Sequence, residues 1–223
     1  MNICGMNCLS KDAVDTDPFF SENQLVSSIK NILTLQNQTD QVDYQIYKVE
    51  LTSLPGYLQV LETGFGNTQK LIMLHGYGGC SATFFKMFPK LKTHFHIFAI
   101  DLYGMGASYR FNFDQIKNFE DAIKTMTTSI HECISNLELD NFYMLGHSMG
   151  GYLIPHYLTR FNHIRVRGVF MCSPAGFNKP DEDNLDRWLD RMLSNKGIGD
   201  SWITRNGAKG LWKSGMSIIH GTK

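Results

Sequence analysis

The sequence predicts a single α/β domain built on a mostly parallel sheet with helices on both faces. Short, continuous apolar runs recur through the middle of the chain, and segments with apolar residues at helical spacing separate them. Strands that alternate with helices in this way are joined by right-handed crossovers and lie parallel. With 223 residues, 43% of them hydrophobic, the chain is long enough for one sizeable core and too short to favour two domains.

The N-terminal part carries a lead-in, a helix and a hairpin. Residues 1–20 are polar and are expected to be mobile, and Ser21–Leu35 has apolar residues at helical spacing. Tyr44–Leu51 and Gly56–Thr63 alternate between apolar and polar residues, with Pro55-Gly56 between them. We therefore expect an antiparallel hairpin ahead of the parallel strands.

The apolar runs after residue 70 set out the parallel part of the sheet. Each is short enough for a strand that is buried on both faces. They are Leu71–Leu74, Phe95–Ile100, Phe142–Leu145 and Val166–Met171. Helical spacing predicts helices between them over Ser81–Leu91, Phe119–Leu137 and Met149–Phe161. Pro155 lies inside the last of these and is expected to kink that helix or to shift its start.

The residues that follow each apolar run are the place to seek chemistry, because ligands of such sheets bind beyond the carboxyl ends of the strands. One of these segments, Gly146-His147-Ser148-Met149-Gly150, is a G-x-S-x-G pentapeptide. This pattern puts a serine on a strained strand-to-helix turn, and its glycines let neighbouring backbones approach. Ser148 is therefore the candidate nucleophile. The alternative is a serine that caps a helix in a nucleotide-binding sheet.

The segment His75-Gly76-Tyr77-Gly78-Gly79 follows an earlier strand and suits the other half of an oxyanion hole. An acyl-transfer intermediate needs two donors aimed at its oxygen, and we expect the backbone N–H groups of Tyr77 and Met149 to supply them. A phosphate-binding loop is disfavoured, because neither G-x-G-x-x-G nor Gly-Lys-Ser/Thr occurs. The expected supporting residues are His75, Gly76, Gly78, Gly146 and Gly150.

At these motifs the chain resembles the α/β-hydrolase family, and within it the abhydrolase-domain 4/5 group of lipid hydrolases and lipase co-activators. The resemblance covers residues 55–180. It rests on four segments: Leu74–Gly79, Asp101–Arg110, Leu145–Tyr152 and Ser173–Phe177. Some members of that group keep the serine and hydrolyse lipid esters, and others have lost it and act by binding a protein partner. By resemblance, a chain with the serine acts on a fatty-acyl ester or a lysophospholipid.

The rest of a catalytic triad is not found. In the resembled fold an Asp or Glu follows the seventh strand and a His follows the eighth, and neither strand is predicted here, so the chain is expected to lack the last two strands and to be truncated at its C-terminus. The acidic cluster Asp181-Glu182-Asp183 is better explained as the start of a helix, and His220 lies too near the end for a good base. His147 is expected to pack rather than to catalyse.

A second arrangement considered for the base is the string from His96 to Asp101. An H-x-x-x-x-D string pairs a base with a carboxylate in acyltransferases. Here it lies in a predicted strand, where a five-residue separation puts the two side chains on opposite faces. We therefore expect no catalytic pair from these residues.

Composition limits the partners. The charges balance at 21 Lys plus Arg and 21 Asp plus Glu, which gives no basic footprint for nucleic acid. Five scattered cysteines and the lack of a signal-like apolar run favour a cytoplasmic location, and no cofactor or metal site is expected. No segment is apolar enough to span a membrane, so any contact with a membrane or a lipid droplet would be peripheral.

The expected division of the chain is a lead-in and helix over residues 1–43, a hydrolase core over 44–180 and a partial helical cap over 181–223. Two functions stay open from sequence. One is a serine ester hydrolase or acyltransferase that acts on acyl lipids. The other is a non-catalytic lipid- or protein-binding regulator.

Overall fold

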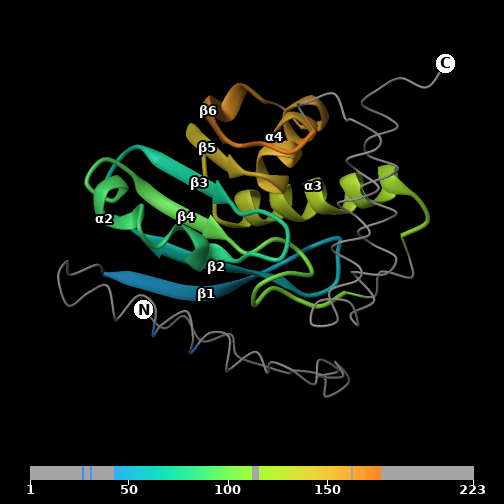
Figure 1. Cartoon of the computed structure of the whole chain (residues 1–223), viewed down its shortest axis with the longest axis horizontal. Coiled ribbons are helices and arrows are strands. Elements are labelled where there is room, and N and C mark those ends of the chain that lie inside the picture. The colour runs from blue at the N-terminus through green and yellow to red at the C-terminus, as the bar shows by residue number, and fades with distance from the viewer. Residues whose placement is uncertain (1–26, 28–30, 32–42, 112–115, 162, 177–223) are drawn as a thin grey trace, which may run out of the picture.

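The computed structural model describes residues 27, 31, 43–111, 116–161 and 163–176 (Figure 1). Positions 27 and 31 are helical, and the remainder of the helix predicted over Ser21–Leu35 lies outside the described residues. The predicted cap over 181–223 also lies outside them.

In the part of the chain that the structure describes, six strands form one sheet in the order β1-β2-β4-β3-β5-β6. Their bounds are β1 Tyr44–Glu50, β2 Tyr57–Thr63, β3 Lys70–Leu74, β4 His96–Ile100, β5 Phe142–His147 and β6 Val166–Cys172. Every strand predicted from the apolar and alternating runs is present, within one or two residues at each end. The sheet explains why the runs differ, because β3 and β4 are buried almost throughout while β1 exposes Gln45, Lys48 and Glu50.

The strand directions agree with the prediction of an antiparallel hairpin ahead of parallel strands. β1 and β2 pair antiparallel as a hairpin, which Leu51 N–H closes on the Gly56 carbonyl at 2.8 Å. β2 also runs antiparallel to β4. β4, β3, β5 and β6 are mutually parallel, so their carboxyl ends meet at one edge of the sheet.

The helices agree with the prediction except between β3 and β4. α3 spans Phe119–Asn136 and α4 spans Met149–Arg160, and η3 is a short turn over His163–Arg165. The single helix expected over Ser81–Leu91 is instead a 3-10 turn, η1 Ser81–Phe84, followed by α2 Phe88–Leu91. Pro89 explains the division, because proline has no N–H for a helix interior and belongs in a first turn. α4 keeps Pro155 inside it and still begins at Met149.

Both ends of α3 have defined caps. The Asn118 side chain accepts a hydrogen bond from the N–H of Asp121 at the start. At the other end Glu138 N–H donates to Ser135 C=O, and Leu139 N–H donates to Ile134 C=O, which is the Schellman arrangement. That arrangement needs a left-handed residue after the cap, and Glu138 takes this position with φ 52°.

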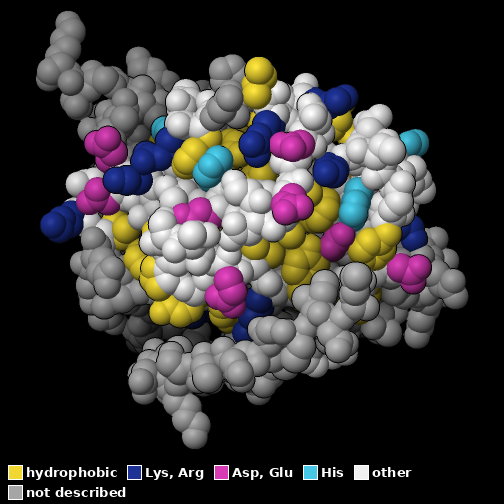
Figure 2. Space-filling model, turned by 180° about the vertical axis from the view of Figure 1, so that it is seen from behind, with side chains coloured by type: hydrophobic (Ala, Val, Ile, Leu, Met, Phe, Trp, Pro, Cys, Tyr) yellow, Lys and Arg dark blue, Asp and Glu magenta, His cyan; other side chains and the backbone are white. Residues whose placement is uncertain are grey.

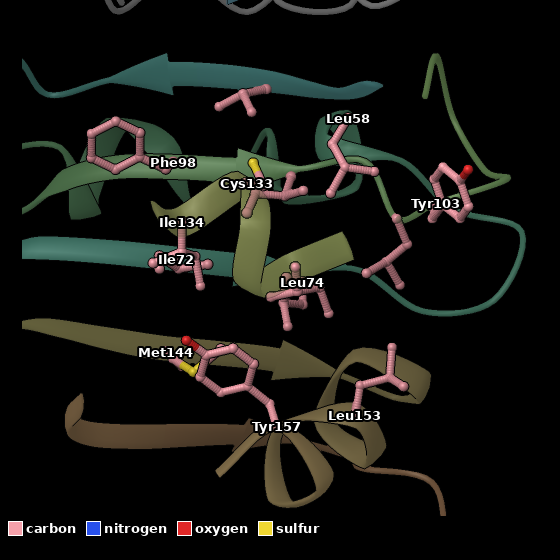
Figure 3. Close-up of a cluster of buried hydrophobic side chains, with 14 of the residues drawn as sticks. Leu58, Ile72, Leu74, Phe98, Tyr103, Cys133, Ile134, Met144, Leu153 and Tyr157 are labelled. Atoms are coloured by element: carbon pink, nitrogen blue, oxygen red, sulfur yellow. The ribbon is translucent and has the colours of Figure 1, made fainter. Parts of the chain in front are cut away.

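Two hydrophobic clusters lie on opposite faces of the sheet. α3 and α4 cover one face, where Ile72 and Leu74 point, and η1 and α2 cover the other, where Leu71 and Met73 point. Figure 3 shows the larger cluster, in which Ile134 of α3 and Leu153 and Tyr157 of α4 lie over side chains from β2 to β5. Helices on both faces are therefore confirmed for the described residues.

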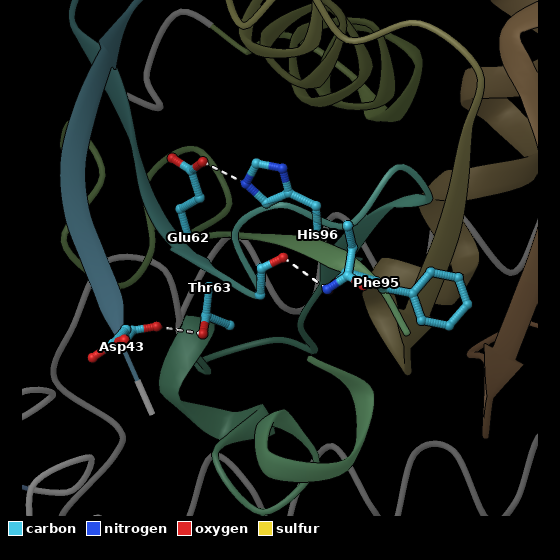
Figure 4. A network of polar contacts seen from close by, with 7 residues as sticks. Asp43, Glu62, Thr63, Phe95 and His96 are labelled. Atoms are coloured by element: carbon cyan, nitrogen blue, oxygen red, sulfur yellow. Dashed lines mark hydrogen bonds and ion pairs between the residues drawn. The ribbon is translucent and has the colours of Figure 1, made fainter. Parts of the chain in front are cut away.

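A polar network joins the amino end of β4 to the carboxyl end of β2, and that end of β2 to the residue before β1 (Figure 4). The His96 ring lies 2.6 Å from the Glu62 carboxylate, and Thr63 Oγ1 donates to the Asp43 carbonyl at 2.6 Å. Asp101 lies at the other end of β4 with different partners, so His96 and Asp101 form no pair. This agrees with the expectation that their string is accidental.

The surface is mixed in character. On the face seen in Figure 2, Lys and Arg side chains are interspersed with Asp and Glu, so no field of a single sign covers it. β6, the last strand in the described part of the sheet, carries two exposed apolar side chains: Phe170 is 46% exposed and Met171 is 38% exposed. Among the described residues no helix is both long and apolar enough to cross a membrane.

Candidate active site

Ser148 lies at the junction of β5 and α4, where the strand stops and the helix begins at the next residue. Its φ of 51° and ψ of −112° are rare for a residue with a side chain, at a typical cost of about 1–3 kcal/mol. Such strain persists only where the surroundings fix it. The hydroxyl makes no cap hydrogen bond to the helix, so it is not the helix-capping serine considered above.

The end of β6 supplies the contacts that fix this turn. Ser148 N–H donates to the Cys172 carbonyl at 3.1 Å, and the N–H of Ala175 donates to the Ser148 carbonyl at 2.9 Å. Tyr152 N–H donates to the same carbonyl at 3.0 Å within α4. Sequence reasoning did not find the roles of Cys172 and Ala175, because both act through backbone atoms that any residue type carries.

The glycines on either side of Ser148 are required by close backbone contacts. A Cβ on Gly146 would lie 2.5 Å from the Gly151 nitrogen, and a Cβ on Gly150 would lie 2.2 Å from the Leu74 carbonyl oxygen. Neither position can hold a larger residue without movement of the backbone. The pentapeptide therefore has the mechanical role that its pattern predicts.

The glycine-rich loop after β3 lies beside Ser148. Leu74 is the register partner of Gly146, so the residues that follow β3 and β5 run next to each other. A Cβ on Gly76 would lie 3.0 Å from the Cβ of Ser148 and 3.1 Å from Nδ1 of His147. The structure thus brings together two segments that are some seventy positions apart in sequence.

Two backbone amides near Ser148 have no acceptor among the residues that the structure describes. Met149 is the first residue of α4, and Tyr77 follows Gly76 in the loop. Within those residues, no carbonyl accepts a hydrogen bond from either N–H group. The positive end of the α4 dipole adds to the preference of this place for negative charge. Tyr77 is 38% exposed, so its amide lies in a part of the loop that solvent reaches.

His75 is fully buried beneath this loop and uses both ring nitrogens. Nδ1 lies 2.7 Å from the Gly76 carbonyl oxygen, and Leu102 N–H lies 2.9 Å from Nε2. Because the amide must donate, Nε2 accepts and the proton is on Nδ1, which donates to Gly76. Burial lowers the pKa of His75 more than the nearby Asp101 raises it, so the ring stays neutral.

Asp101 braces the neighbouring loop and is not free to orient a base. One carboxylate oxygen accepts from Ser81 N–H, and the other accepts from Ala107 N–H at 2.8 Å. Its own carbonyl accepts from the hydroxyl of Ser108. A Cβ on Gly106 would lie 2.2 Å from Asp101 Oδ2, so the carboxylate is packed on all sides.

No base for Ser148 is found in the part of the chain that the structure describes. The Ser148 hydroxyl has no hydrogen-bond partner there. The Nδ1 of His147 is enclosed without a partner, with its ring against Gly76, as expected of a packing residue. Within the same residues, no cluster of three or more His, Cys, Asp and Glu side chains could hold a metal ion.

Curated relatives match a little over half of this chain. A probable 1-acylglycerol-3-phosphate O-acyltransferase of Oryza sativa subsp. japonica is 34% identical over 126 residues, which is 56% of this chain and 30% of the rice protein. The 1-acylglycerol-3-phosphate O-acyltransferase ABHD5 of Homo sapiens is 34% identical over 122 residues, which is 54% of this chain and 34% of the human protein. The chain thus spans about a third of the length of the curated relatives it matches.

Solved structures share the fold at low identity. Naproxen esterase (carboxylesterase NP) from Bacillus subtilis is superimposable with a TM-score of 0.62 at 20% identity, over 92% of this chain and 72% of the esterase. Haloalkane dehalogenase DbeA from Bradyrhizobium elkani gives a TM-score of 0.58 at 21% identity, over 74% and 55% of the two chains. Residues 70–197 match the family described as alpha/beta hydrolase fold. The resemblance seen in the motifs is therefore confirmed, and the chain belongs to the alpha/beta hydrolase fold family.

Proposed function

We propose that this chain carries the nucleophile and the oxyanion hole of a serine hydrolase or acyltransferase that acts on fatty-acyl lipids. One observation carries the proposal. Ser148 is held at a strained positive φ beside Gly76, with the N–H groups of Tyr77 and Met149 free of acceptors among the described residues. A strained residue and unpaired amides both cost stability, and together they are what an acyl-transfer site requires.

In the proposed reaction the Ser148 oxygen attacks the carbonyl carbon of an acyl ester. The carbonyl oxygen becomes negative and accepts hydrogen bonds from the amides of Tyr77 and Met149. The bond to the leaving alcohol then breaks, and the serine proton passes through a general base to that alcohol. Water or a second alcohol attacks the acyl-serine, which gives hydrolysis or acyl transfer. The base and its acid are not assigned to residues of this chain.

The names of the relatives support the lipid part of the proposal. The rice protein is named a probable 1-acylglycerol-3-phosphate O-acyltransferase and the human protein a 1-acylglycerol-3-phosphate O-acyltransferase, and both names describe acyl transfer to a lysophospholipid. Residues 70–197, which match the alpha/beta hydrolase fold family, hold the Ser148 turn and the Gly76 loop. We infer that this chain takes a fatty-acyl ester or a lysophospholipid, and that it meets a membrane or a lipid droplet only at the surface.

A fluorophosphonate probe tests the nucleophile, because it reacts with activated serines. We expect labelling of the chain that maps to Ser148 by peptide mass spectrometry and disappears in Ser148→Ala. Ser135→Ala is the matched control, since Ser135 is an exposed serine on α3 and should label like the parent. Labelling that persists in Ser148→Ala would refute the assignment.

A lipid assay then separates the two reactions. The chain is incubated with a fatty-acyl ester, with and without 1-acylglycerol-3-phosphate, and the products are analysed by mass spectrometry. Free fatty acid alone indicates hydrolysis, and a diacylglycerol phosphate indicates transfer. Neither product, with a labelled Ser148, would exclude this substrate class.

A second candidate function is a lipid- or protein-binding module without catalysis. The observation in its favour is that the Ser148 hydroxyl has no base beside it among the described residues. A hydroxyl without a base is a weak nucleophile. A sample that unfolds cooperatively and does not react with the probe, but does bind lysophospholipid vesicles, would favour this function over the first.

A further inference from the structure

The peptide unit between Gly76 and Tyr77 is fixed through its carbonyl oxygen. That oxygen accepts two hydrogen bonds, from Nδ1 of His75 at 2.7 Å and from the N–H of Gly79 at 3.1 Å. The chain has no cis peptide among its described residues, so this unit is planar and trans. In a trans unit the C=O and the N–H point in opposite directions. The Tyr77 N–H therefore points away from the buried His75 ring.

The His75 ring is itself held from its other side. Leu102 N–H donates to Nε2 at 2.9 Å, and Leu102 directly follows the buried β4 strand and Asp101. His75 is completely buried, so neither nitrogen can exchange its partner for water. A rigid series of bonds thus runs from the end of β4 through the ring to the Gly76 carbonyl.

We propose that His75 is a positioning residue that aims the Tyr77 amide N–H into the space beside Ser148. It acts through the Gly76 carbonyl and touches no reacting atom. This inference rests on the proposed function for its catalytic consequence, since the amide is one of the two proposed oxyanion donors. The Gly76 Cα borders Ser148, so a small rotation of this peptide unit would move the N–H relative to the serine.

Two substitutions each keep one of the two hydrogen bonds that the His75 ring makes. In His75→Asn the amide nitrogen stands close to the place of Nδ1 and can donate to Gly76, while Leu102 N–H loses its acceptor. In His75→Gln the side-chain oxygen reaches the place of Nε2 and accepts from Leu102, while the Gly76 carbonyl keeps only Gly79. Each variant loses one buried hydrogen bond, but His75→Asn leaves the Leu102 N–H without its acceptor while His75→Gln leaves the Gly76 carbonyl with one donor. His75→Asn should therefore be the less stable of the two.

The rate constant of fluorophosphonate labelling at Ser148 is the first measurement. Removal of an oxyanion donor lowers rates by about 10²–10³-fold, so a misdirected donor should cost at least about tenfold. We expect His75→Gln to label at least about tenfold more slowly than His75→Asn, although urea unfolding should show His75→Gln to be the more stable variant. Equal rates, or a slower rate in His75→Asn, would overturn the proposal, because a purely structural role predicts the larger loss in the less stable variant.

Nuclear magnetic resonance of the ¹⁵N-labelled chain provides a readout that does not need catalysis. Long-range ¹H–¹⁵N spectra of the wild type should show His75 with a protonated Nδ1 and a bare Nε2, and the Tyr77 amide signal should move in His75→Gln far more than in His75→Asn. If the wild type fails to label at Ser148, the proposed function fails and these spectra still decide the positioning. If a variant does not fold, the wild-type tautomer decides, and a proton on Nε2 would overturn the proposal.

Discussion

Substitution of Gly150 by alanine sets two effects of known sign against each other. Gly150 is the second residue of α4, and in an exposed helix an alanine there would be favoured by about 0.8–1.0 kcal/mol. Its added Cβ, however, would stand 2.2 Å from the carbonyl oxygen of Leu74 and 2.8 Å from that of His75. Both oxygens are backbone atoms of the central strand β3 and the residue after it, and neither can turn aside.

The contact decides the outcome. The Cβ lies about 0.8 Å inside the 3.0 Å limit that real contacts respect, so β3 and α4 must separate. Overpacking of this kind typically costs about 1–3 kcal/mol, and we take the upper end because only backbone can move. The gain in helix propensity offsets about 1 kcal/mol of this cost, so Gly150→Ala should lower the unfolding free energy by about 2 kcal/mol. For a chain of this size that is a fall of about 4–8 °C in Tm.

Urea unfolding followed by circular dichroism measures this loss, and Gly78→Ala is the matched control. Gly78 has φ 68° and nothing within 4 Å of an added methyl group, so alanine there meets only the left-handed strain of about 1 kcal/mol. Gly150→Ala should therefore be the less stable of the two. If it is as stable as the wild type, α4 does not pack tightly on the end of β3 and the reasoning is wrong.

Three further outcomes follow from contacts outside the proposed nucleophile. Glu138→Gly should raise the unfolding free energy by about 1 kcal/mol, because glycine adopts the left-handed backbone at the end of α3 without strain. Alanine keeps that strain, so an equal gain in Glu138→Ala would contradict this explanation. Asp101→Asn should lower the unfolding free energy, measured in urea, by about 2–3 kcal/mol. In the wild type each carboxylate oxygen accepts from a backbone N–H, and in the variant one of these N–H groups would face the NH₂ of the asparagine. An unchanged unfolding free energy would mean that the loop rearranges. Burial, and then Arg165, lower the pKa of His131, so the folded state resists its protonation. Stability should therefore decrease as the pH falls below about 6.5, the pKa of histidine in the unfolded chain. Between about pH 7.5 and about pH 5.5 the urea midpoint of His131→Phe should decrease less than that of the wild type. Identical decreases in the two proteins would exclude His131 as a contributor.

The strands were predictable because burial on both faces leaves a strong mark in the sequence. Runs such as Leu71–Leu74 are continuous and apolar, and each run became a strand at the expected place. The prediction was wrong for Ser81–Leu91, where helical spacing outweighed the signal of Pro89. Apolar spacing describes which face is buried, and it does not say whether the backbone between two contacts is one helix or two short turns.

The candidate site was predictable to the extent that side chains or glycines define it. Ser148 and the glycines around it lie where the pentapeptide and its context placed them, and Gly76 borders the serine. The contacts from Cys172 and Ala175 left no mark, because they use backbone atoms. The ring of His75 lies in the expected loop, but the bond that its Nε2 accepts depends on the position of Leu102, which only the folded chain defines.

The contacts of β6 with Ser148 have a consequence for the order of events in folding. The unusual backbone of the serine is held by a carbonyl and an amide that β6 and the residues after it deliver, so a chain in which this strand has not yet docked cannot keep it. The proposed reactivity at Ser148 therefore requires that β6 has already docked beside β5. A brief pulse of probe at increasing times of refolding would then act as a clock for that step.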